Sequence, residues 1–271
     1  MRISRTCATF AACAMVTTIV ACGSNSEPRS TPYGLLSPTS SPSSSAVALP
    51  TDSPQPTTTA VTRHVFVVVM ENTGLDNAVR SEPIARLASA NALATNYHAV
   101  ARPSLPNYLA LTSGNTWGIT DDGYHSLPDA ADLGAQLTTA GVSWRAYMEG
   151  MTADAGCLRS PYPYALKHDP GHDCTLEVAG TWLDGLVSRI ESSEAWRSGG
   201  TLFIVWDEGN GGDRNLVPLI VLTKDATPMR VETQYDHYSL LATIEDLFHL
   251  PRLGAGATAT PLTQLIAGGV H

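Results

Sequence analysis

The sequence has little charge and little cysteine, and both shortages narrow its possible functions. Only 15% of its 271 residues are charged, and 16 basic side chains face 25 acidic ones, which leaves a formal net charge of −9. This acidic balance argues against nucleic-acid binding and against a polybasic membrane surface. Hydrophobic residues make up 43% of the chain, so most of it can bury a core and is not intrinsically disordered.

Two common functional motifs are also absent. The five cysteines form no Cys-x-x-Cys pair, which excludes a zinc site of that kind. There is no Gly-x-Ser-x-Gly elbow, and Pro103-Ser104-Leu105-Pro106 cannot make that turn. A Ser-His-Asp hydrolase is therefore disfavoured.

The N-terminus has the pattern of an export signal. Arg2 and Arg5 precede an uncharged run, Thr6–Ala21, which is too short to span a bilayer comfortably. Small residues then lead to Cys22, as in a bacterial lipobox, where the cysteine is lipidated. We expect residues 1–21 to be a lipoprotein signal peptide and the protein to be lipid-anchored to the outer face of the cytoplasmic membrane, or secreted. An ordinary signal peptide cut nearby is the alternative.

Beyond the signal lies a segment that cannot form a core. From Ser24 to Ala60, 23 of 37 residues are Ser, Thr or Pro, which predicts a disordered tether over residues 22–61. The catalytic domain is expected at 62–271. Once the signal is removed and Cys22 carries lipid, Cys157 and Cys174 remain. An even pair in an oxidising compartment predicts a disulfide between them.

Strands alternate with helices in the remaining chain. Apolar runs predict strands at 64–70, 142–148, 201–206 and 217–223. Helical spacing predicts helices at 82–96, 106–113, 130–140, 182–196 and 238–250. This alternation indicates an α/β sandwich with a mostly parallel sheet, in which ligands bind at the carboxyl ends of the strands.

Polar residues follow two of these strands and open the last helix. Glu71-Asn72 follows the first strand, Asp207-Glu208 follows the strand at 201–206, and Asp236-His237 begins the final helix. Together, carboxylate and amide oxygens suit a divalent cation. Taken singly, each could be a helix cap or a loop carboxylate.

Ser104 stands at a predicted helix N-terminus, with Pro106 in the first turn. By itself it could be an ordinary cap, but free N–H groups there can also hold a phosphoryl group. A serine hydroxyl becomes a good nucleophile beside a base or a metal ion. His168, His172 and His237 could stabilise an oxyanion, protonate a leaving group or bind metal.

In this order, these motifs resemble the phosphoesterase family of bacterial acid phosphatases and non-haemolytic phospholipases C, in the alkaline phosphatase superfamily. The likeness is strongest to secreted acid phosphatases of the SapM type and covers about residues 62–256. The matching segments are His64–Asn72, Pro103–Asn115, Cys157–His168, Gly171–Cys174, Leu202–Gly209 and Tyr235–Leu250.

The resemblance implies an alkaline-phosphatase-like three-layer α/β/α sandwich and a role for each site residue. Ser104 would be the nucleophile, with His168, His172 and His237 lining the phosphate pocket. Asn72, Asn107 and Arg102 would bind phosphate. One divalent ion, which could be calcium, magnesium, manganese or zinc, would be held by Glu71, Asn72, Asp207 and Glu208.

Two departures from the family pattern stand out. Relatives usually carry His where this chain has Arg102, and arginine can clamp phosphate but cannot transfer protons. The motifs at His168 and His172 nearly touch, whereas the family separates them by several tens of residues, including a strand. The chain is therefore either a naturally compact member or one that has lost a strand and part of its pocket wall.

The leading hypothesis is an exported, metal-dependent phosphatase that hydrolyses phosphate monoesters through a phosphoseryl intermediate on Ser104. Its partner would be a phosphorylated small molecule or a phospholipid head group, with the membrane reached only through the lipid anchor. A phospholipase C or other phosphodiesterase could use the same site. A catalytically degenerate lipoprotein that binds phosphate in the cell envelope is the alternative from another class.

Overall fold

The computed structural model describes residues 63–127, 129–147, 175–211, 214–224 and 227–266. The predicted signal peptide, the tether and Cys22 lie outside these residues. The same holds for the predicted disulfide of Cys157 with Cys174, and for His168 and His172.

A five-stranded sheet forms the centre of the fold, in the order β1-β4-β5-β2-β6. The strands are β1 (His64–Met70), β4 (Gly200–Trp206), β5 (Leu219–Thr223), β2 (Ala92–Ala94) and β6 (Met229–Val231). β1 runs parallel to β4 and β2 parallel to β6, whereas β5 is antiparallel to both of its neighbours. Four strands thus share one direction, so the sheet is mixed but mostly parallel, as predicted.

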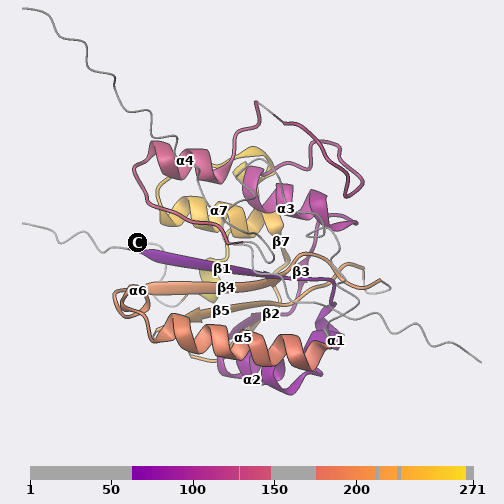
Figure 1. Ribbon diagram of the computed structural model, residues 1–271, viewed down its shortest axis with the longest axis vertical. Helices are drawn as coiled ribbons and strands as arrows, with labels where there is room; N and C mark the ends of the chain where they lie inside the picture. The colour runs from indigo at the N-terminus through magenta and orange to yellow at the C-terminus, as the bar shows by residue number, and fades with distance from the viewer. Residues whose placement is uncertain (1–62, 128, 148–174, 212–213, 225–226, 267–271) are drawn as a thin grey trace, which may run out of the picture. The chain divides into compact units, whose positions relative to one another are not determined.

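Helices flank the sheet in two groups (Figure 1). One group holds α3 (Ser104–Ser113), α4 (Leu133–Thr139) and α7 (His237–Leu247). The other holds α1 (Leu75–Ala78), α2 (Glu82–Ala90), α5 (Leu176–Glu191) and α6 (Glu194–Arg197). Two helical layers enclosing one sheet confirm the predicted α/β architecture. Two 3-10 helices follow α7, η2 (Gly254–Ala257) and η3 (Thr263–Leu265).

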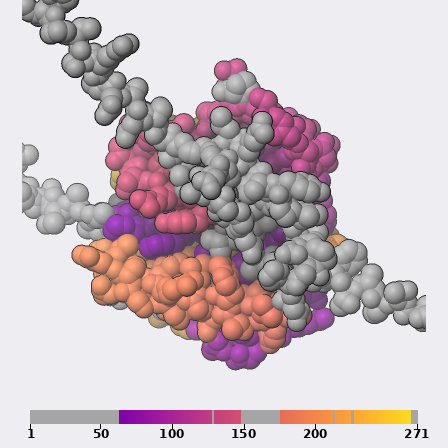
Figure 2. Space-filling model, in the orientation of Figure 1, coloured from indigo at the N-terminus to yellow at the C-terminus, as the bar shows by residue number. Residues whose placement is uncertain are grey.

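The apolar strands explain why the sheet needs cover on both faces. Residues Leu202–Trp206 of β4 are almost fully buried, with Phe203 paired to Val67 of β1 and to Val221 of β5. A continuous apolar run of this kind is stable only when helices remove both faces from water. β1 stands at the end of the strand order, and Figure 2 shows part of it between α4 and α5.

A second, very short sheet pairs β3 (Tyr97–His98) with β7 (Tyr235–Asp236) in parallel. Tyr97 lies opposite Tyr235, and both side chains are buried. This pairing brings the start of α7 to the segment that leads into α3. It thus places two distant parts of the chain near the ends of the central strands.

The predicted strand at 142–148 is wrong over the part that the structure describes, because residues 142–147 form no strand. Val142 and Trp144 instead pack against the hydrophobic core. The Trp144 indole N–H donates to Thr138 Oγ1 of α4 over 2.9 Å. These side chains bury their apolar surface against the core beside α4. The segment therefore does not have to pair with a strand to remove that surface from water.

Two helix predictions have wrong boundaries. The helix predicted at 82–96 ends at Ala90, because Asn91 turns to an extended conformation and its amide donates to the Leu87 carbonyl. Residues beyond it form the buried strand β2. The helix predicted at 182–196 starts earlier, at Leu176. It is interrupted near Ser193, whose side chain caps α6.

Within the described ranges, no helix combines the length and the apolar character needed to cross a membrane.

Candidate active site

The candidate site lies where β1 and β4 end side by side. Met70 pairs with Trp206, so the next residues of the two strands, Glu71 and Asp207, emerge next to each other. The Asn72 backbone N–H donates to Asp207 Oδ1 over 2.9 Å and joins the two strand ends. The expectation that ligands gather at the carboxyl ends of parallel strands therefore leads to these residues.

Ser104 meets this strand end from the first turn of α3. Its Oγ donates to Glu208 Oε1 over 2.8 Å, and both side chains are buried. The Leu105 backbone N–H donates to Asp122 Oδ1, so a carboxylate already caps one of the free N–H groups of α3. The pairing of a serine with a carboxylate gives the hydroxyl a defined direction and an acceptor for its proton.

Arg102 approaches the same carboxylate from the solvent side. Its Nε lies 3.9 Å from Glu208 Oε2 and donates to the Gly209 carbonyl over 3.2 Å. The side chain keeps 40% of its surface exposed. Arg102 therefore sets a partly exposed positive charge beside the Ser104–Glu208 pair, and an arginine in such a position can bind a phosphate group.

Asp207 has an unusual environment for an acid. Its Oδ1 accepts the N–H groups of Asn72 and Glu208, at 2.9 and 2.7 Å. Its Oδ2 is buried and has no hydrogen-bond partner among the described residues. Burial raises the pKa of Asp207 to about 7, against the opposing hydrogen bond from the Asn72 N–H. A buried carboxylate oxygen without a donor calls for a proton or a cation.

The predicted metal ligands fit a divalent cation in their chemistry. Glu71 is buried at the end of β1, and Asn72 adopts a left-handed backbone with a φ of 50°. Such a φ is uncommon for residues other than glycine and marks a sharp change of chain direction after β1. Across the described residues, however, no three His, Cys, Asp or Glu side chains converge on one metal position. The predicted metal site thus stays a prediction.

His237 lies behind Asp207 and is fully buried. Its Nε2 lies 2.7 Å from the Asp207 backbone oxygen, and its Nδ1 lies 2.9 Å from the Tyr97 hydroxyl. Burial lowers the pKa of His237 to about 4, so the ring is neutral at neutral pH. Because both ring nitrogens contact protein atoms, neither can reach a phosphate group in this arrangement.

Asn107, predicted to bind phosphate, makes a different set of contacts. Its Oδ1 accepts the N–H groups of Val100 and Ala101, each at 3.0 Å. Its Nδ2 donates to the carbonyls of Ala101 and Pro103, at 3.0 and 3.1 Å. The fully buried amide has no hydrogen-bonding capacity left for phosphate. Instead, it fixes the conformation of the loop that contains Arg102 and leads into α3 at Ser104.

Asp236 likewise proves to be a cap. Its Oδ1 accepts the Ser239 backbone N–H over 3.0 Å, and the Ser239 hydroxyl completes a capping box at the start of α7. Of the two interpretations that the sequence left open for this carboxylate, a helix cap is therefore the correct one. Asp236 is not among the predicted cation ligands.

Asn215 is a site residue that sequence reasoning missed. Its Oδ1 accepts the Gly209 N–H over 2.9 Å, and its Nδ2 donates to the carbonyls of Ala99 and Ala101. It thereby ties the turn after β4 to the loop before α3. The sequence offers only one signal for it, an asparagine shortly before a strand. Asparagine adopts a φ such as the observed 63° more readily than most residues, but asparagines are common in loops, so the signal is weak.

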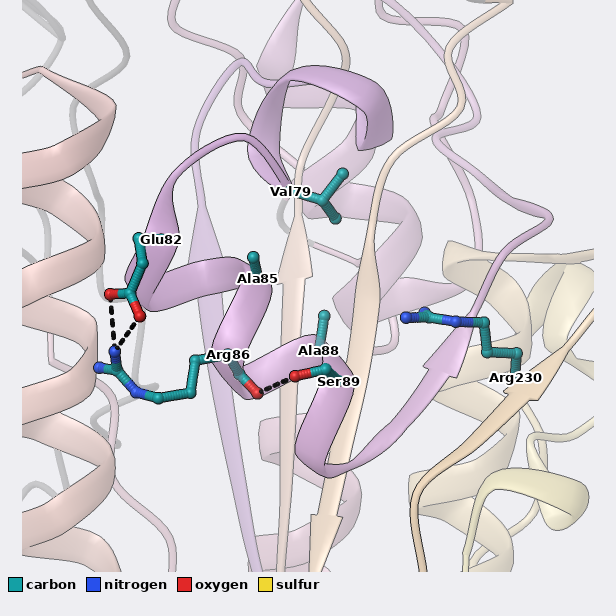
Figure 3. A pocket seen from close by; sticks show the side chains of 7 residues that line it. All are labelled: Val79, Glu82, Ala85, Arg86, Ala88, Ser89 and Arg230. Carbon is teal, nitrogen blue, oxygen red and sulfur yellow. Dashed lines mark hydrogen bonds and ion pairs between the residues drawn. The ribbon is translucent and has the colours of Figure 1, made fainter.

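A separate pocket lies on the other helical layer, against α2 and β6 (Figure 3). Arg86 in its wall pairs with Glu82 over 2.7 Å and with Asp184 over 3.1 Å. Arg230 reaches it from β6. None of the residues that line this pocket belongs to the candidate site, so we place the chemistry at the strand ends.

Comparisons with known proteins find phosphatases among the relatives of this chain. The model of the phosphoesterase family matches residues 78–170. A phosphatidylinositol-3-phosphatase from Mycobacterium tuberculosis is 27% identical over 74% of this chain and 82% of its own length. A probable acid phosphatase from Kluyveromyces lactis is 25% identical over 78% of this chain, which spans 64% of that relative.

A solved structure from Vibrio parahaemolyticus, described as a protein in the alkaline phosphatase superfamily, aligns at 9% identity with a TM-score of 0.42. The alignment covers 69% of this chain and 66% of that one. The match to the family model and the homology to acid phosphatases come from the sequence itself and do not depend on this weak alignment. Over residues 78–170 the chain is similar to the phosphoesterase family, and over about three quarters of its length it is similar to known phosphatases at 25–27% identity.

Proposed function

We propose that the chain is a metal-dependent phosphatase that hydrolyses phosphate monoesters through Ser104. The observation that carries this proposal is the 2.8 Å hydrogen bond from Ser104 Oγ to Glu208 Oε1, at the buried carboxyl end of β4. A buried serine beside a carboxylate and an arginine has the parts of a nucleophile directed at phosphorus. The acid phosphatases among its relatives support the choice of substrate class.

The chemistry would proceed by two in-line displacements. Ser104 Oγ attacks phosphorus and its proton passes to Glu208, while the bond from phosphorus to the ester oxygen breaks and the leaving alkoxide takes a proton from water. The hydroxide that this leaves then attacks the phosphoserine, the bond from phosphorus to Ser104 Oγ breaks, and Glu208 returns its proton to the serine as inorganic phosphate is released. Arg102 holds phosphoryl oxygens through both steps, because its charge lies beside the Ser104–Glu208 pair and stays partly exposed.

Glu71, Asn72, Asp207 and Glu208 would hold one divalent ion, which could be calcium, magnesium, manganese or zinc. The buried Asp207 Oδ2 supports this assignment, because a cation would neutralise an oxygen that lacks a hydrogen-bond donor among the described residues. When bound, such an ion neutralises charge on the phosphoryl group and favours the serine alkoxide.

A phosphorylated lipid head group is one candidate substrate, since one relative is named a phosphatidylinositol-3-phosphatase. A phosphorylated small molecule is the other, in line with the acid phosphatases. We further propose, from the sequence alone, that residues 1–21 direct export and that lipid on Cys22 tethers the domain to the membrane.

The test is hydrolysis of p-nitrophenyl phosphate by the full chain with excess EDTA or with added magnesium, calcium, manganese or zinc. Bis(p-nitrophenyl) phosphate serves as the diester control. Turnover of the monoester that requires a cation supports a metal-dependent phosphatase. Faster turnover of the diester would favour a phosphodiesterase, and binding of phosphate without turnover under any cation would favour a degenerate binding protein.

A further inference from the structure

Three elements that are distant in the sequence meet behind the candidate site. Tyr97 comes from β3, His237 from the first turn of α7, and Asp207 from the end of β4. The Tyr97 hydroxyl lies 2.9 Å from His237 Nδ1, and His237 Nε2 lies 2.7 Å from the Asp207 backbone oxygen. The Tyr97 and His237 side chains are fully buried, so these bonds are shielded from water.

In the neutral form of His237, only one arrangement of protons satisfies both contacts. A backbone carbonyl can only accept, so the Nε2–H of His237 donates to Asp207. The Nδ1 of the neutral ring then accepts, and the Tyr97 hydroxyl donates to it. Burial raises the pKa of Tyr97 well above its ordinary value, so its hydroxyl keeps the proton that this direction needs.

These bonds act on one peptide unit of the site. The carbonyl of Asp207 and the N–H of Glu208 belong to the same peptide plane. His237 holds the carbonyl, while Asp207 Oδ1 accepts the N–H over 2.7 Å. A plane held at both ends resists rotation, and its orientation restricts the directions in which the Asp207 and Glu208 side chains leave the backbone. Glu208 in turn receives the Ser104 hydroxyl.

We propose that Tyr97 and His237 are positioning residues that lock the peptide between Asp207 and Glu208, and so aim the carboxylates toward Ser104 and its phosphate substrate. This inference rests on the proposed phosphatase function. In it His237 acts through Asp207 and does not touch the substrate, which differs from the pocket-lining role that the family resemblance implies. Tyr97 acts one step further back, by fixing the orientation and the proton of the histidine.

The neighbouring tyrosine offers a matched control. Tyr235 lies opposite Tyr97 in the short sheet and is also buried, but its hydroxyl takes no part in the bonds to Asp207. The Tyr97 and His237 rings lie 5.5 Å apart at an angle of 56°, a contact that phenylalanine can keep. Tyr97→Phe and Tyr235→Phe therefore each remove one buried hydroxyl, and only the first removes a donor to His237.

The first experiment measures kcat and KM for p-nitrophenyl phosphate in both variants of the full chain. We expect Tyr97→Phe to lower kcat about tenfold, the worth of one buried hydrogen bond, with KM within about twofold of the wild type. Tyr235→Phe should keep the wild-type kcat. Equal kcat values in the two variants, at equal thermal stability, would overturn the proposal.

A second pair of variants tests His237 itself. His237→Gln keeps an N–H donor that can reach the Asp207 carbonyl, whereas His237→Leu removes it. We expect the glutamine variant to retain at least about tenfold more kcat than the leucine variant. If the two are equally impaired, or if leucine is as active as glutamine, the donor to Asp207 has no positioning role.

Amide hydrogen exchange separates this proposal from the proposed phosphatase function, because it needs no turnover. The Glu208 N–H is protected by Asp207 Oδ1, so it should exchange faster in Tyr97→Phe than in Tyr235→Phe. Unchanged exchange contradicts the positioning role even if the enzyme is active. Faster exchange in a chain that shows no turnover would support the lock, and the phosphatase assignment alone would fail.

Discussion

Ser104 Oγ donates to Glu208 Oε1 over 2.8 Å, although the two residues are 104 positions apart in the chain. The bond joins the first turn of α3 to the end of β4, and both side chains are buried. A serine hydroxyl held this way has its proton directed at the carboxylate, which leaves its other lone pairs for a reaction partner. The proposed chemistry depends on this pair.

Replacing Glu208 with glutamine should therefore abolish most of the activity. Glu208→Gln keeps the shape of the side chain but removes the charge that accepts the serine proton, so we expect kcat to fall by about 10²-fold or more. Glu177→Gln is the matched control, because Glu177 accepts a hydrogen bond from Ser81 Oγ away from the site. Steady-state kinetics on both variants decide the matter; equal activity would show that Glu208 is only a structural acceptor.

Arg102 should act mainly on substrate binding. Its guanidinium reaches Glu208 while 40% of the side chain stays exposed, so we expect Arg102→Ala to raise KM about tenfold, with a smaller effect in Arg102→Lys. Arg86→Ala removes a comparably exposed arginine from the other helical layer and should leave KM unchanged (Figure 3). An unchanged KM in Arg102→Ala would contradict contact with the phosphoryl group.

Asn107 should matter for stability more than for affinity. Its amide makes four hydrogen bonds to the backbone of residues 100–103, so Asn107→Ala leaves several buried groups unpaired. We expect the free energy of unfolding to fall by about 2–4 kcal/mol, measured by urea denaturation. A variant with wild-type stability but weakened inhibition by inorganic phosphate would instead support the original prediction that Asn107 binds phosphate.

Glu245 should make stability depend on pH. This residue of α7 is buried, and burial raises its pKa from 4.5 to about 7, against an opposing hydrogen bond from the Leu253 N–H. The folded state thus holds the proton more tightly, and the stability linked to this group is present below pH 4.5 and lost as pH rises through about 7.

Glu245→Gln keeps the acceptor for Leu253 but cannot ionise. We expect its melting temperature to exceed that of the wild type by roughly 2–4 °C above pH 7, and the difference to vanish below pH 4.5. Thermal unfolding from pH 4 to 8 measures this difference. A constant offset across that range would show that Glu245 does not titrate on unfolding.

Much of the fold could be predicted because its signals are local. β1 and β4 are continuous apolar runs, and the residues that follow them, Glu71 and Asp207, could be placed together by the rule for parallel strands. β2 was missed because it is only three residues long and follows a helix in a sequence with helical spacing. Its strand conformation depends on β5 and β6, which are distant in the sequence.

The candidate site, too, could be predicted only where its signals are local in the sequence. Ser104 could be predicted from its helix start and family motif, but the roles of His237 and Asn107 could not. Their residue types suit phosphate contact equally well, and only the tertiary structure shows that their polar atoms contact other groups of the protein. Tyr97 and Asn215 carry no motif at all. Their importance arises from contacts across more than 100 residues.

The most direct test of the account is to look for phosphate on Ser104. The full chain is incubated with p-nitrophenyl phosphate and the required cation, quenched in acid, and digested for mass spectrometry. We predict one phosphoryl group on the peptide that contains Ser104, with kcat lowered at least about 10³-fold in Ser104→Ala. Ser113→Ala, which removes a buried serine at the other end of α3, should keep its activity. Phosphate on a histidine instead, or undiminished turnover in Ser104→Ala, would contradict the account.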